Sequence, residues 1–281
     1  MACVSILVRA RNDEALIGRT LEGIFSQKVD FKHEVIVCDD GSTDRTREIA
    51  AKFPVRFFER PQGPYKPGRT LNALVAAAEG DIVVFNNSDA VPLDEHWLSE
   101  LVKPLVAQPD KPRFTFANQM PRKDAAALVR KDSERAFGDG RIQATWKFFF
   151  SLASSATWTK LLREVPFDEQ IQYSEDVEWT WRNSRRRENP VEIVYCPDAH
   201  VEHSHNYTLA QLAKRFRGEG KADKAIFGES PPLICEVAAA MRETLRDWIY
   251  LAPHPRDWRE IPSAPIRRLV QRISHWKGAR S

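Results

Sequence analysis

The chain has 281 residues, which allow one large domain or one domain with a smaller appendage, and 42% of them are hydrophobic, which is enough for a packed core. Its 42 basic and 39 acidic residues leave a net charge of only +3, which excludes a general affinity for nucleic acid. Arg9 and Arg11 interrupt the first apolar run too early for a signal peptide or a membrane span, so we expect neither. The four cysteines are widely spaced and form no metal-binding pattern, so free thiols and a cytoplasmic location are expected.

The first hundred residues alternate between strand and helix patterns. Short apolar runs rich in β-branched residues predict strands at 4–8, 34–38, 54–58 and 82–85. Helical spacing predicts helices between them, the first capped by Asn12 or Asp13. This alternation predicts an α/β fold with a mostly parallel sheet and right-handed crossovers.

The remaining residues continue the pattern and then become helical. Strands are predicted at 113–117 and 191–195, and a further short strand is expected to end near His203 and His205. The charges and alanines of 122–141 favour a helix. Two longer helices are predicted at 209–227 and 233–251.

Polar residues follow the first two strands. Asp39 and Asp40 end the second strand, and Ala10, Arg11 and Glu14 end or follow the first. Open α/β sheets bind ligands at the carboxyl ends of their strands, so a polar ligand is predicted here. Two interpretations of the acids stay open: a turn that caps the next helix, or carboxylates that accept a hydrogen bond from the imide of a pyrimidine base.

The strand predicted at 82–85 is followed by Asn87, Ser88 and Asp89, which resemble an Asp-x-Asp metal motif whose first acid has become an amide. A hard divalent cation takes oxygen ligands and can bridge a carboxylate to a diphosphate. Asp89 is therefore the predicted metal ligand, with an exposed turn as the alternative.

His203 and His205 are candidates for the same metal site. Because they alternate along a predicted strand, they should point to opposite faces, so that only one reaches the cation. We favour His203 and keep His205 as its rival, and a hydrogen-bonded structural histidine is the alternative for either.

Glu175 and Asp176 open a predicted helix, where acids also serve simply as caps. Asp176 is the candidate general base that takes the proton of an attacking hydroxyl. Glu175, Trp158 and Trp179 are candidates for the acceptor pocket, with core packing as the alternative for the two tryptophans.

The order and spacing of these segments resemble the inverting glycosyltransferases of family 2, from residue 4 to about residue 220. The matching segments are 4–12, 37–44, 69–72, 80–90, 167–169 and 174–176. The resemblance implies the GT-A fold, a Rossmann-like sheet flanked by helices, with a helical C-terminal extension. It places a GT-A domain at 1–220, with a donor half at about 1–110 and an acceptor half at about 111–220, and the extension at 221–281.

The resemblance also implies the chemistry. Asp39 or Asp40 would lie near the base of a UDP, dTDP or GDP sugar, Arg69 near the diphosphate with Asn72 beside it, and Asp89 on Mn²⁺ or Mg²⁺. Asp176 would be the base. Segment 201–208 looks like that of rhamnosyltransferase-type members, in which a histidine completes the metal site.

An enzyme of this kind would act on saccharide or lipid-linked acceptors in cell-envelope polysaccharide or glycolipid assembly. Two alternatives are a non-catalytic sugar-nucleotide-binding protein of the same fold and a sugar nucleotidyltransferase. The second alternative would need a glycine-rich loop after the first strand, and residues 9–14 contain no glycine.

The last 27 residues, 255–281, are basic, with seven basic and two acidic residues. Apolar residues recur among them at helical spacing. Two interpretations stay open: a helix on an anionic membrane surface at the inner face of the membrane, or a helix packed on the domain with a solvated basic face.

Overall fold

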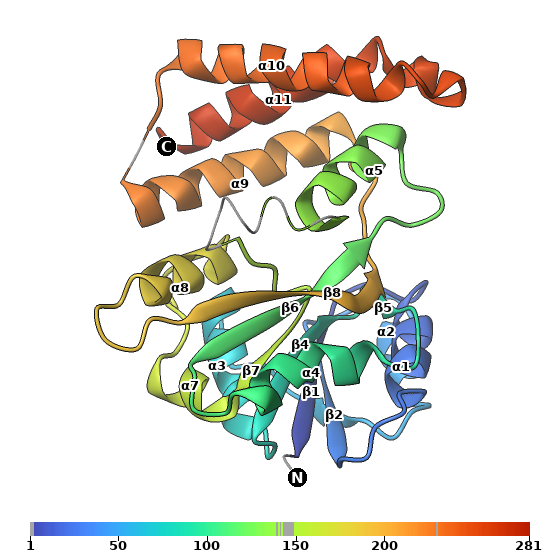
Figure 1. The fold of residues 1–281 in the computed structure, drawn as a ribbon, viewed down its shortest axis with the longest axis vertical. Coiled ribbons are helices and arrows are strands. Elements are labelled where there is room, and N and C mark those ends of the chain that lie inside the picture. The colour runs from blue at the N-terminus through green and yellow to red at the C-terminus, as the bar shows by residue number, and fades with distance from the viewer. Residues whose placement is uncertain (1–2, 139, 141, 143–148, 229) are drawn as a thin grey trace. The chain divides into compact units, whose positions relative to one another are not determined.

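The computed structural model describes residues 3–138, 140, 142, 149–228 and 230–281 (Figure 1). Backbone contacts divide the chain into two units, and each is described by itself. Unit 1 comprises Met1–Met120, Ala136–Gln170 and Glu175–His203. Unit 2 comprises Pro121–Arg135, Ile171–Ser174 and Ser204–Ser281.

The described part of unit 1 is built on a sheet of eight strands in the order β3-β2-β1-β4-β7-β6-β8-β5 (Figure 1). Neighbouring strands among β1 to β4 are parallel, and β7 runs antiparallel to both β4 and β6. The strands are β1 (Val4–Ala10), β2 (His33–Asp39), β3 (Arg56–Phe58), β4 (Ile82–Asn87), β5 (Val91–Pro92), β6 (Arg113–Met120), β7 (Ser154–Trp158) and β8 (Glu192–Glu202).

Helices cover both faces of this sheet, which explains why its central strands are apolar on both sides. Ile6 and Val8 of β1 belong to a core with helices α1 and α4, whereas Leu7 belongs to a second core with α3, α7 and α8. These helices and the short α2 are α1 (Ile17–Phe25), α2 (Thr46–Ala50), α3 (Pro67–Ala77), α4 (Trp97–Ala107), α7 (Thr159–Glu164) and α8 (Glu175–Ser184).

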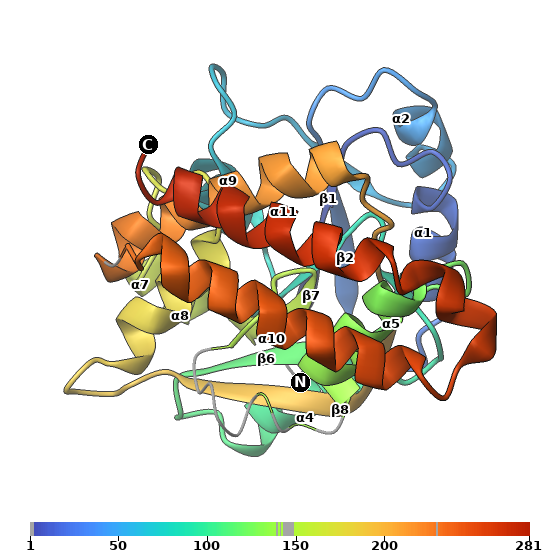
Figure 2. The same cartoon turned by 90° about the horizontal axis from the view of Figure 1, so that it is seen from above.

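Unit 2 is helical in the part that the structure describes. Its long helices are α9 and α10, and α11 packs against both of them (Figure 2). A Cβ atom on Gly220 of α9 would collide with the carbonyl oxygen of His275, and one on Gly278 would collide with that of Arg217. Two glycines therefore let α9 and α11 approach closely. The elements are α5 (Ala127–Ser133), α9 (Leu209–Phe227), α10 (Leu233–Leu251), the 3₁₀ turn η2 (Pro255–Glu260) and α11 (Ser263–Gly278).

The predicted strands at 4–8, 34–38, 82–85 and 113–117 and the helices at 209–227 and 233–251 are confirmed. The predicted helix at 122–141 is shorter: α5 is followed by a π-helical turn, η1 (Glu134–Gly138), and residues 139 and 141 lie outside the described residues. The predicted domain boundary at 220 falls inside α9, which continues without a break to Phe227.

Two local predictions are wrong. Asn12 and Asp13 do not cap α1 with their side chains, because the Asn12 amide oxygen accepts the N–H of Thr43 at 2.8 Å and the Asp13 carboxylate accepts the hydroxyl of Ser88. The separate short strand before His203 does not exist either. One long strand, β8, ends at Glu202, so the histidines lie beyond it and strand alternation does not orient them.

Among the described residues, none of the helices combines the length and the hydropathy that crossing a bilayer requires.

Candidate active site

The carboxyl ends of β1, β2 and β4 lie side by side at one end of the unit 1 sheet, here called its carboxyl edge. The register places Ala10, at the end of β1, opposite Asp39, at the end of β2. On the other side of β1, Arg9 lies opposite Asn87, at the end of β4. Because these strands are parallel, the loops that carry most of the predicted donor-binding residues all leave the sheet at this edge.

Arg9 connects two of these segments from within β1. Its guanidinium donates to the Glu175 carboxylate at 3.1 Å and to the Asn87 side-chain oxygen at 3.3 Å. Burial by itself would lower the pKa of Arg9, but Glu175, Tyr65 and Asp176 together outweigh burial, Glu175 most strongly, and the pKa is raised. The charged guanidinium of Arg9 thus links the start of α8 to the end of β4, and the side-chain oxygen of Asn87 is engaged as its hydrogen-bond acceptor.

The two acids at the end of β2 have different partners. Asp39 is buried, and its carboxylate accepts the N–H of Ser42 at 3.3 Å and the hydroxyl of the same residue at 2.5 Å. Asp40 pairs with Arg11 at 3.1 Å and with Arg60. Asp39 therefore closes the turn after β2, whereas Asp40 lies between two cations near the surface.

Asp13 and Glu14 hold the loop after β1. The Asp13 carboxylate accepts the hydroxyl of Ser88, a buried residue, and burial raises the pKa of Asp13. Glu14 accepts the backbone N–H of Arg45 at 3.1 Å. Glu14, predicted to bind the donor, therefore lies beside the start of α2, and Ser88 is bound to Asp13.

Asp89 and His203 come together as the metal-site prediction requires. The Nε2 atom of His203 lies 3.6 Å from the Oδ1 atom of Asp89, and both side chains are largely buried. The Nδ1 atom of His203 lies 2.8 Å from the Oε1 atom of Gln119. Gln119 donates its own amide N–H to Ser151 at 2.7 Å, which leaves Oε1 to accept from the histidine. This pairing assigns the proton of a neutral imidazole to Nδ1 and directs the Nε2 lone pair to Asp89.

This pair fits a divalent cation. Two ligand atoms on one Mn²⁺ or Mg²⁺ ion lie about 3–3.5 Å apart when each is about 2.1 Å from the ion. The observed separation of 3.6 Å is close to that range. Carboxylate oxygen and imidazole nitrogen are both ligands that manganese accepts.

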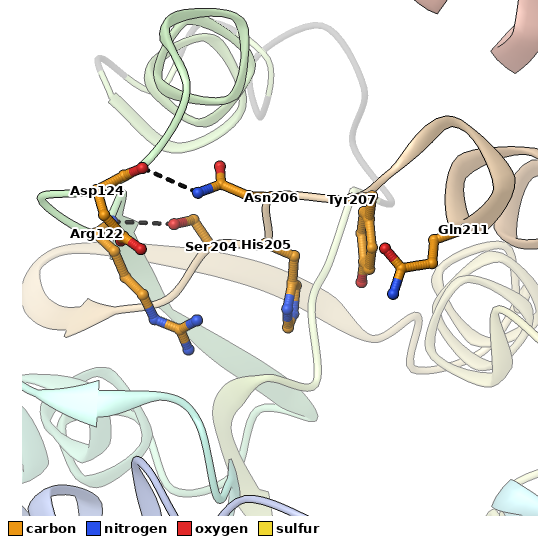
Figure 3. A pocket seen from close by; sticks show the side chains of 7 residues that line it. All are labelled: Arg122, Asp124, Ser204, His205, Asn206, Tyr207 and Gln211. Carbon is orange, nitrogen blue, oxygen red and sulfur yellow. Dashed lines mark hydrogen bonds between the residues drawn. The ribbon is translucent and has the colours of Figure 1, made fainter.

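His205, the rival ligand, belongs to unit 2, where it lines a pocket of about 280 Å³. Its ring stacks on that of Tyr207 with 5.1 Å between the ring centres, and Figure 3 shows Gln211 beside them. Across the same pocket lies Arg122, whose backbone N–H donates to the Ser204 hydroxyl at 3.0 Å (Figure 3). The rival histidine thus lines a polar pocket within unit 2.

Asp176 lies at the start of α8. Its carboxylate accepts the N–H of Val177 at 2.9 Å and that of Leu152 at 3.4 Å. Leu152 comes shortly before Ser154, which pairs with Asn86 near the end of β4, so this acid is held at the same edge of the sheet. Burial, and after it the charge of Glu175, raises the pKa of Asp176 to about 6. A carboxylate with this pKa is ionised at neutral pH and more basic than an ordinary one.

Arg69 and Asn72 both lie on α3. Arg69 is exposed and donates to the carbonyl oxygen of Gln62 at 3.1 Å. The Asn72 side chain donates to the carbonyl oxygen of Phe167 at 3.0 Å and accepts the N–H of the same residue at 2.9 Å. Asn72 therefore anchors the 167–169 segment, and Arg69 stays near the loop that precedes its helix.

Two predictions for the acceptor side are wrong. Trp179 is 0% exposed, donates its indole N–H to the carbonyl oxygen of Val165 at 2.7 Å, and packs edge-on against Phe114 in the core. Trp158 ends β7 and lies opposite Ile82, at the beginning of β4. Because β7 is antiparallel to β4, Trp158 lies at the opposite end of the strands, beside the amino end of β4.

Arg9, Asp13 and Gln119 are site residues that the sequence analysis did not assign. A charged residue near the end of an otherwise apolar strand was a signal for Arg9, because a buried cation needs a carboxylate partner. Gln119 carried no comparable signal, since its partner His203 is 84 positions away along the chain.

Comparisons with known proteins agree with this geometry. The family model described as Glycosyl transferase family 2 matches residues 5–151. The O-antigen chain rhamnosyltransferase WbaN of Salmonella anatum is 27% identical over 207 residues, which are 70% of this chain and 64% of that protein. The chain thus spans somewhat less than two thirds of that relative's length.

Two solved structures share the fold. The mannosyltransferase PcManGT from Pyrobaculum calidifontis, in complex with GDP-Man and Mn²⁺, aligns with a TM-score of 0.61 and 21% identity over 97% of this chain and 87% of that one. Glucosyl-3-phosphoglycerate synthase from Mycobacterium tuberculosis, with Mn²⁺, UDP and glucosyl-3-phosphoglycerate, aligns with a TM-score of 0.57 and 22% identity over 80% of each chain.

Proposed function

The chain belongs to glycosyl transferase family 2, and from this we propose that it moves a sugar from a nucleotide-diphospho-sugar to an acceptor hydroxyl, with inversion of the anomeric carbon. The predicted GT-A fold is confirmed by the structural similarities and the sheet topology. One observation carries the proposal: Asp176, with a pKa raised to about 6, is held at the sheet edge where β1, β2 and β4 end.

Asp176 is the general base of the proposed reaction. Its carboxylate takes the proton of the acceptor hydroxyl while the hydroxyl oxygen bonds to the anomeric carbon. The bond from that carbon to the donor diphosphate breaks in the same step, with the electron pair leaving on the diphosphate. A single displacement of this kind inverts the carbon.

Asp89 and His203 are the proposed ligands of a divalent cation. Mn²⁺ or Mg²⁺ bound there would neutralise the charge that grows on the leaving diphosphate. Support comes from the 3.6 Å separation of the two ligand atoms, from the hydrogen bond of Gln119 to His203, and from the Mn²⁺ in both related structures.

The donor is proposed to lie along the loops after β1 and β2, near Ala10, Arg11, Asp39 and Asp40, with Arg69 toward the diphosphate. GDP and UDP occur in the related structures, and dTDP is the third candidate. The proposed acceptor is a saccharide or a lipid-linked saccharide of cell-envelope polysaccharide or glycolipid assembly, in line with the O-antigen relative. Glu175 stays a proposed acceptor contact, although its carboxylate already pairs with Arg9.

The proposed location is the cytoplasm, at the inner face of the membrane. The four cysteines are free, which accords with a reducing compartment. Residues 255–281 are the proposed contact with the membrane, supported by their excess of basic side chains.

Asp176→Asn is the variant that tests this function. It removes the base and keeps the shape, so transfer from labelled nucleotide sugars should fall by at least about a hundredfold while donor binding persists. Asp110→Asn, at an exposed position after α4, is the matched control and should keep full activity.

Full activity in Asp176→Asn would exclude this residue as the base. Absence of both transfer and donor hydrolysis in the wild type, with donor binding retained, would favour the non-catalytic alternative.

A further inference from the structure

Helix α10 buries all three of its acidic residues and exposes most of its large apolar residues. Glu236, Glu243 and Asp247 are all buried, and Asp247 has no exposed surface at all. On the opposite side, Ile234 is 73% exposed and Met241 is 68% exposed. This is the reverse of the pattern that a helix on the surface of a water-soluble domain normally shows.

The buried acids have cationic partners within unit 2. Asp247 accepts hydrogen bonds from Lys131 of α5 and, at 2.7 Å, from Arg268 of α11. Arg268 also makes a two-pronged pair with Asp132, at 2.8 and 2.9 Å. Because removing one partner of a buried ion pair is costly, this network fixes the rotation of α10 about its axis.

The outward side of α10 is a continuous apolar stripe. At about 100° per residue, five of its six exposed large apolar residues fall within an arc of about 100°, and the sixth, Leu233, lies outside it at the first position of the helix. Trp258 of η2 and Ile266 and Leu269 of α11 add further exposed apolar surface in the same unit. The exposed large apolar residues of α10 that form the stripe are Ile234, Met241, Leu245, Trp248 and Ile249.

The exposed charges of the segment that carries this stripe, residues 233–281, have one sign. Between residues 233 and 281, all of which the structure describes, exposed basic residues occur on all three elements, including Arg242, Arg256, Arg259 and Lys277. No aspartate or glutamate in that segment is exposed. Its remaining acids are engaged too, since Asp257 pairs with Arg130 and Glu260 accepts the N–H of Ala127.

We propose that the α10 stripe, with the exposed basic residues of α10, η2 and α11, binds the surface of an anionic lipid bilayer, with α10 lying in the plane of the interface. Exposed apolar residues accompanied within this segment by exposed basic residues match the boundary between acyl chains and anionic headgroups. The inference deepens the membrane contact of the proposed function and moves its apolar part from residues 255–281 to α10, where the exposed apolar residues are concentrated.

A second copy of this chain fits the surface less well. A symmetric pair would bring two stripes with the same cationic margin together, and the like charges would oppose the contact. The acids that would relieve this repulsion are buried in the network described above.

Vesicle flotation of the full chain tests the proposal. The chain should float with vesicles of phosphatidylcholine mixed with phosphatidylglycerol, less with phosphatidylcholine alone, and less as salt rises. Leu245→Asp should lower the partition coefficient by at least about tenfold, because it replaces an apolar contact with the bilayer by a charge. Val106→Asp is the matched control, since Val106 on α4 is 55% exposed and Leu245 is 56% exposed, and it should float like the wild type.

Two results would overturn the proposal: equal flotation of Leu245→Asp and the wild type, or a dimer in light scattering that Leu245→Asp dissociates while no variant floats. Circular dichroism on each variant checks folding. The double variant Arg256→Gln/Arg259→Gln tests the contribution of the basic residues, and it should lose the preference for vesicles that contain phosphatidylglycerol. Nucleotide calorimetry separates this proposal from the enzymatic one, because Leu245→Asp should bind nucleotide normally. A chain that floats but binds no nucleotide would refute the proposed reaction and leave the surface intact.

Discussion

Two adjacent acids at the start of α8 differ because their surroundings differ. Glu175 faces the guanidinium of Arg9 at 3.1 Å, so its charge is matched. Among the described residues, the hydrogen-bond donors to the Asp176 carboxylate are the backbone N–H groups of Val177 and Leu152, and burial raises the pKa of Asp176 to about 6. The sequence predicted an acid for catalysis at this position, and only the structure shows which neighbour each acid has.

Asp176 also makes a pH-dependent contribution to stability. Below about pH 4 it is protonated in both the folded and unfolded states, and between about pH 4 and pH 6 the folded state holds the proton more tightly. Its contribution to the free energy of unfolding therefore falls as pH rises through this window.

Asp176→Asn should consequently be more stable than the wild type at pH 7.5, by up to about 3 kcal/mol, and equally stable near pH 3.5. Urea unfolding of both proteins at the two pH values measures the difference. A variant that is less stable at pH 7.5 would show that the ionised carboxylate stabilises the fold and that its pKa is not raised.

The placement of individual site residues agrees with the sequence analysis where the residue type limits the chemistry, and it differs where the position in the fold decides. The role of Asp89 and His203 as metal ligands stays a prediction. Asp89 and His203 were paired from their ligand chemistry, and the structure places them 3.6 Å apart. Trp158 and Trp179 were assigned to a pocket from their aromatic rings alone. Neither the antiparallel direction of β7 nor the depth of α8 in the core can be read from a local sequence window.

Among the elements, those with a strong apolar period were predictable. The central strands are buried on both faces, and α9 begins with a capping box between Thr208 and Gln211 and ends at the left-handed Gly228, so their patterns are clear. The sequence analysis missed β7. This strand lies between β4, which carries Phe85, and β6, which carries Phe114, and the order of the strands in the sheet differs from their order along the chain. The sequence analysis predicted two short strands where the structure has the single strand β8, because Pro197 interrupts the strand pattern. In the structure, Pro197 lies beside the irregularity in the pairing of β8 with β6.

The contact of α9 with α11 gives a test at this scale. Gly220→Ala should destabilise unit 2 by roughly 1–3 kcal/mol, because the new methyl group collides with the carbonyl oxygen of His275. An Ala in place of a helical Gly is otherwise favourable by roughly 1 kcal/mol.

Gly138→Ala is the control, since a Cβ there meets no atom of the described residues within 4 Å. Thermal unfolding of both variants should show a lower midpoint for Gly220→Ala alone. Equal midpoints would mean that the two helices separate at no cost.

At the scale of the whole molecule, the candidate site of unit 1 is assembled from distant parts of the chain. Arg9, Asp39, Asn87 and Asp176 reach one sheet edge because three parallel strands end there and Leu152 holds the acid of α8 beside them. Their order along the chain is what allowed the family to be recognised from the sequence. The sequence could not reveal that α10 exposes its apolar side, because the sequence pattern of an amphipathic helix is the same whichever of its two sides is buried.

The central claim is a metal-dependent nucleotide-sugar site at this edge, and one measurement addresses it most directly. Calorimetric titration of UDP, dTDP and GDP, each with and without Mn²⁺, should show one nucleotide binding to the wild type only with the metal present. Asp89→Ala should abolish that binding, whereas Asp110→Asn should preserve it. Binding of no nucleotide, or equal binding to the wild type and Asp89→Ala with and without Mn²⁺, would contradict the account.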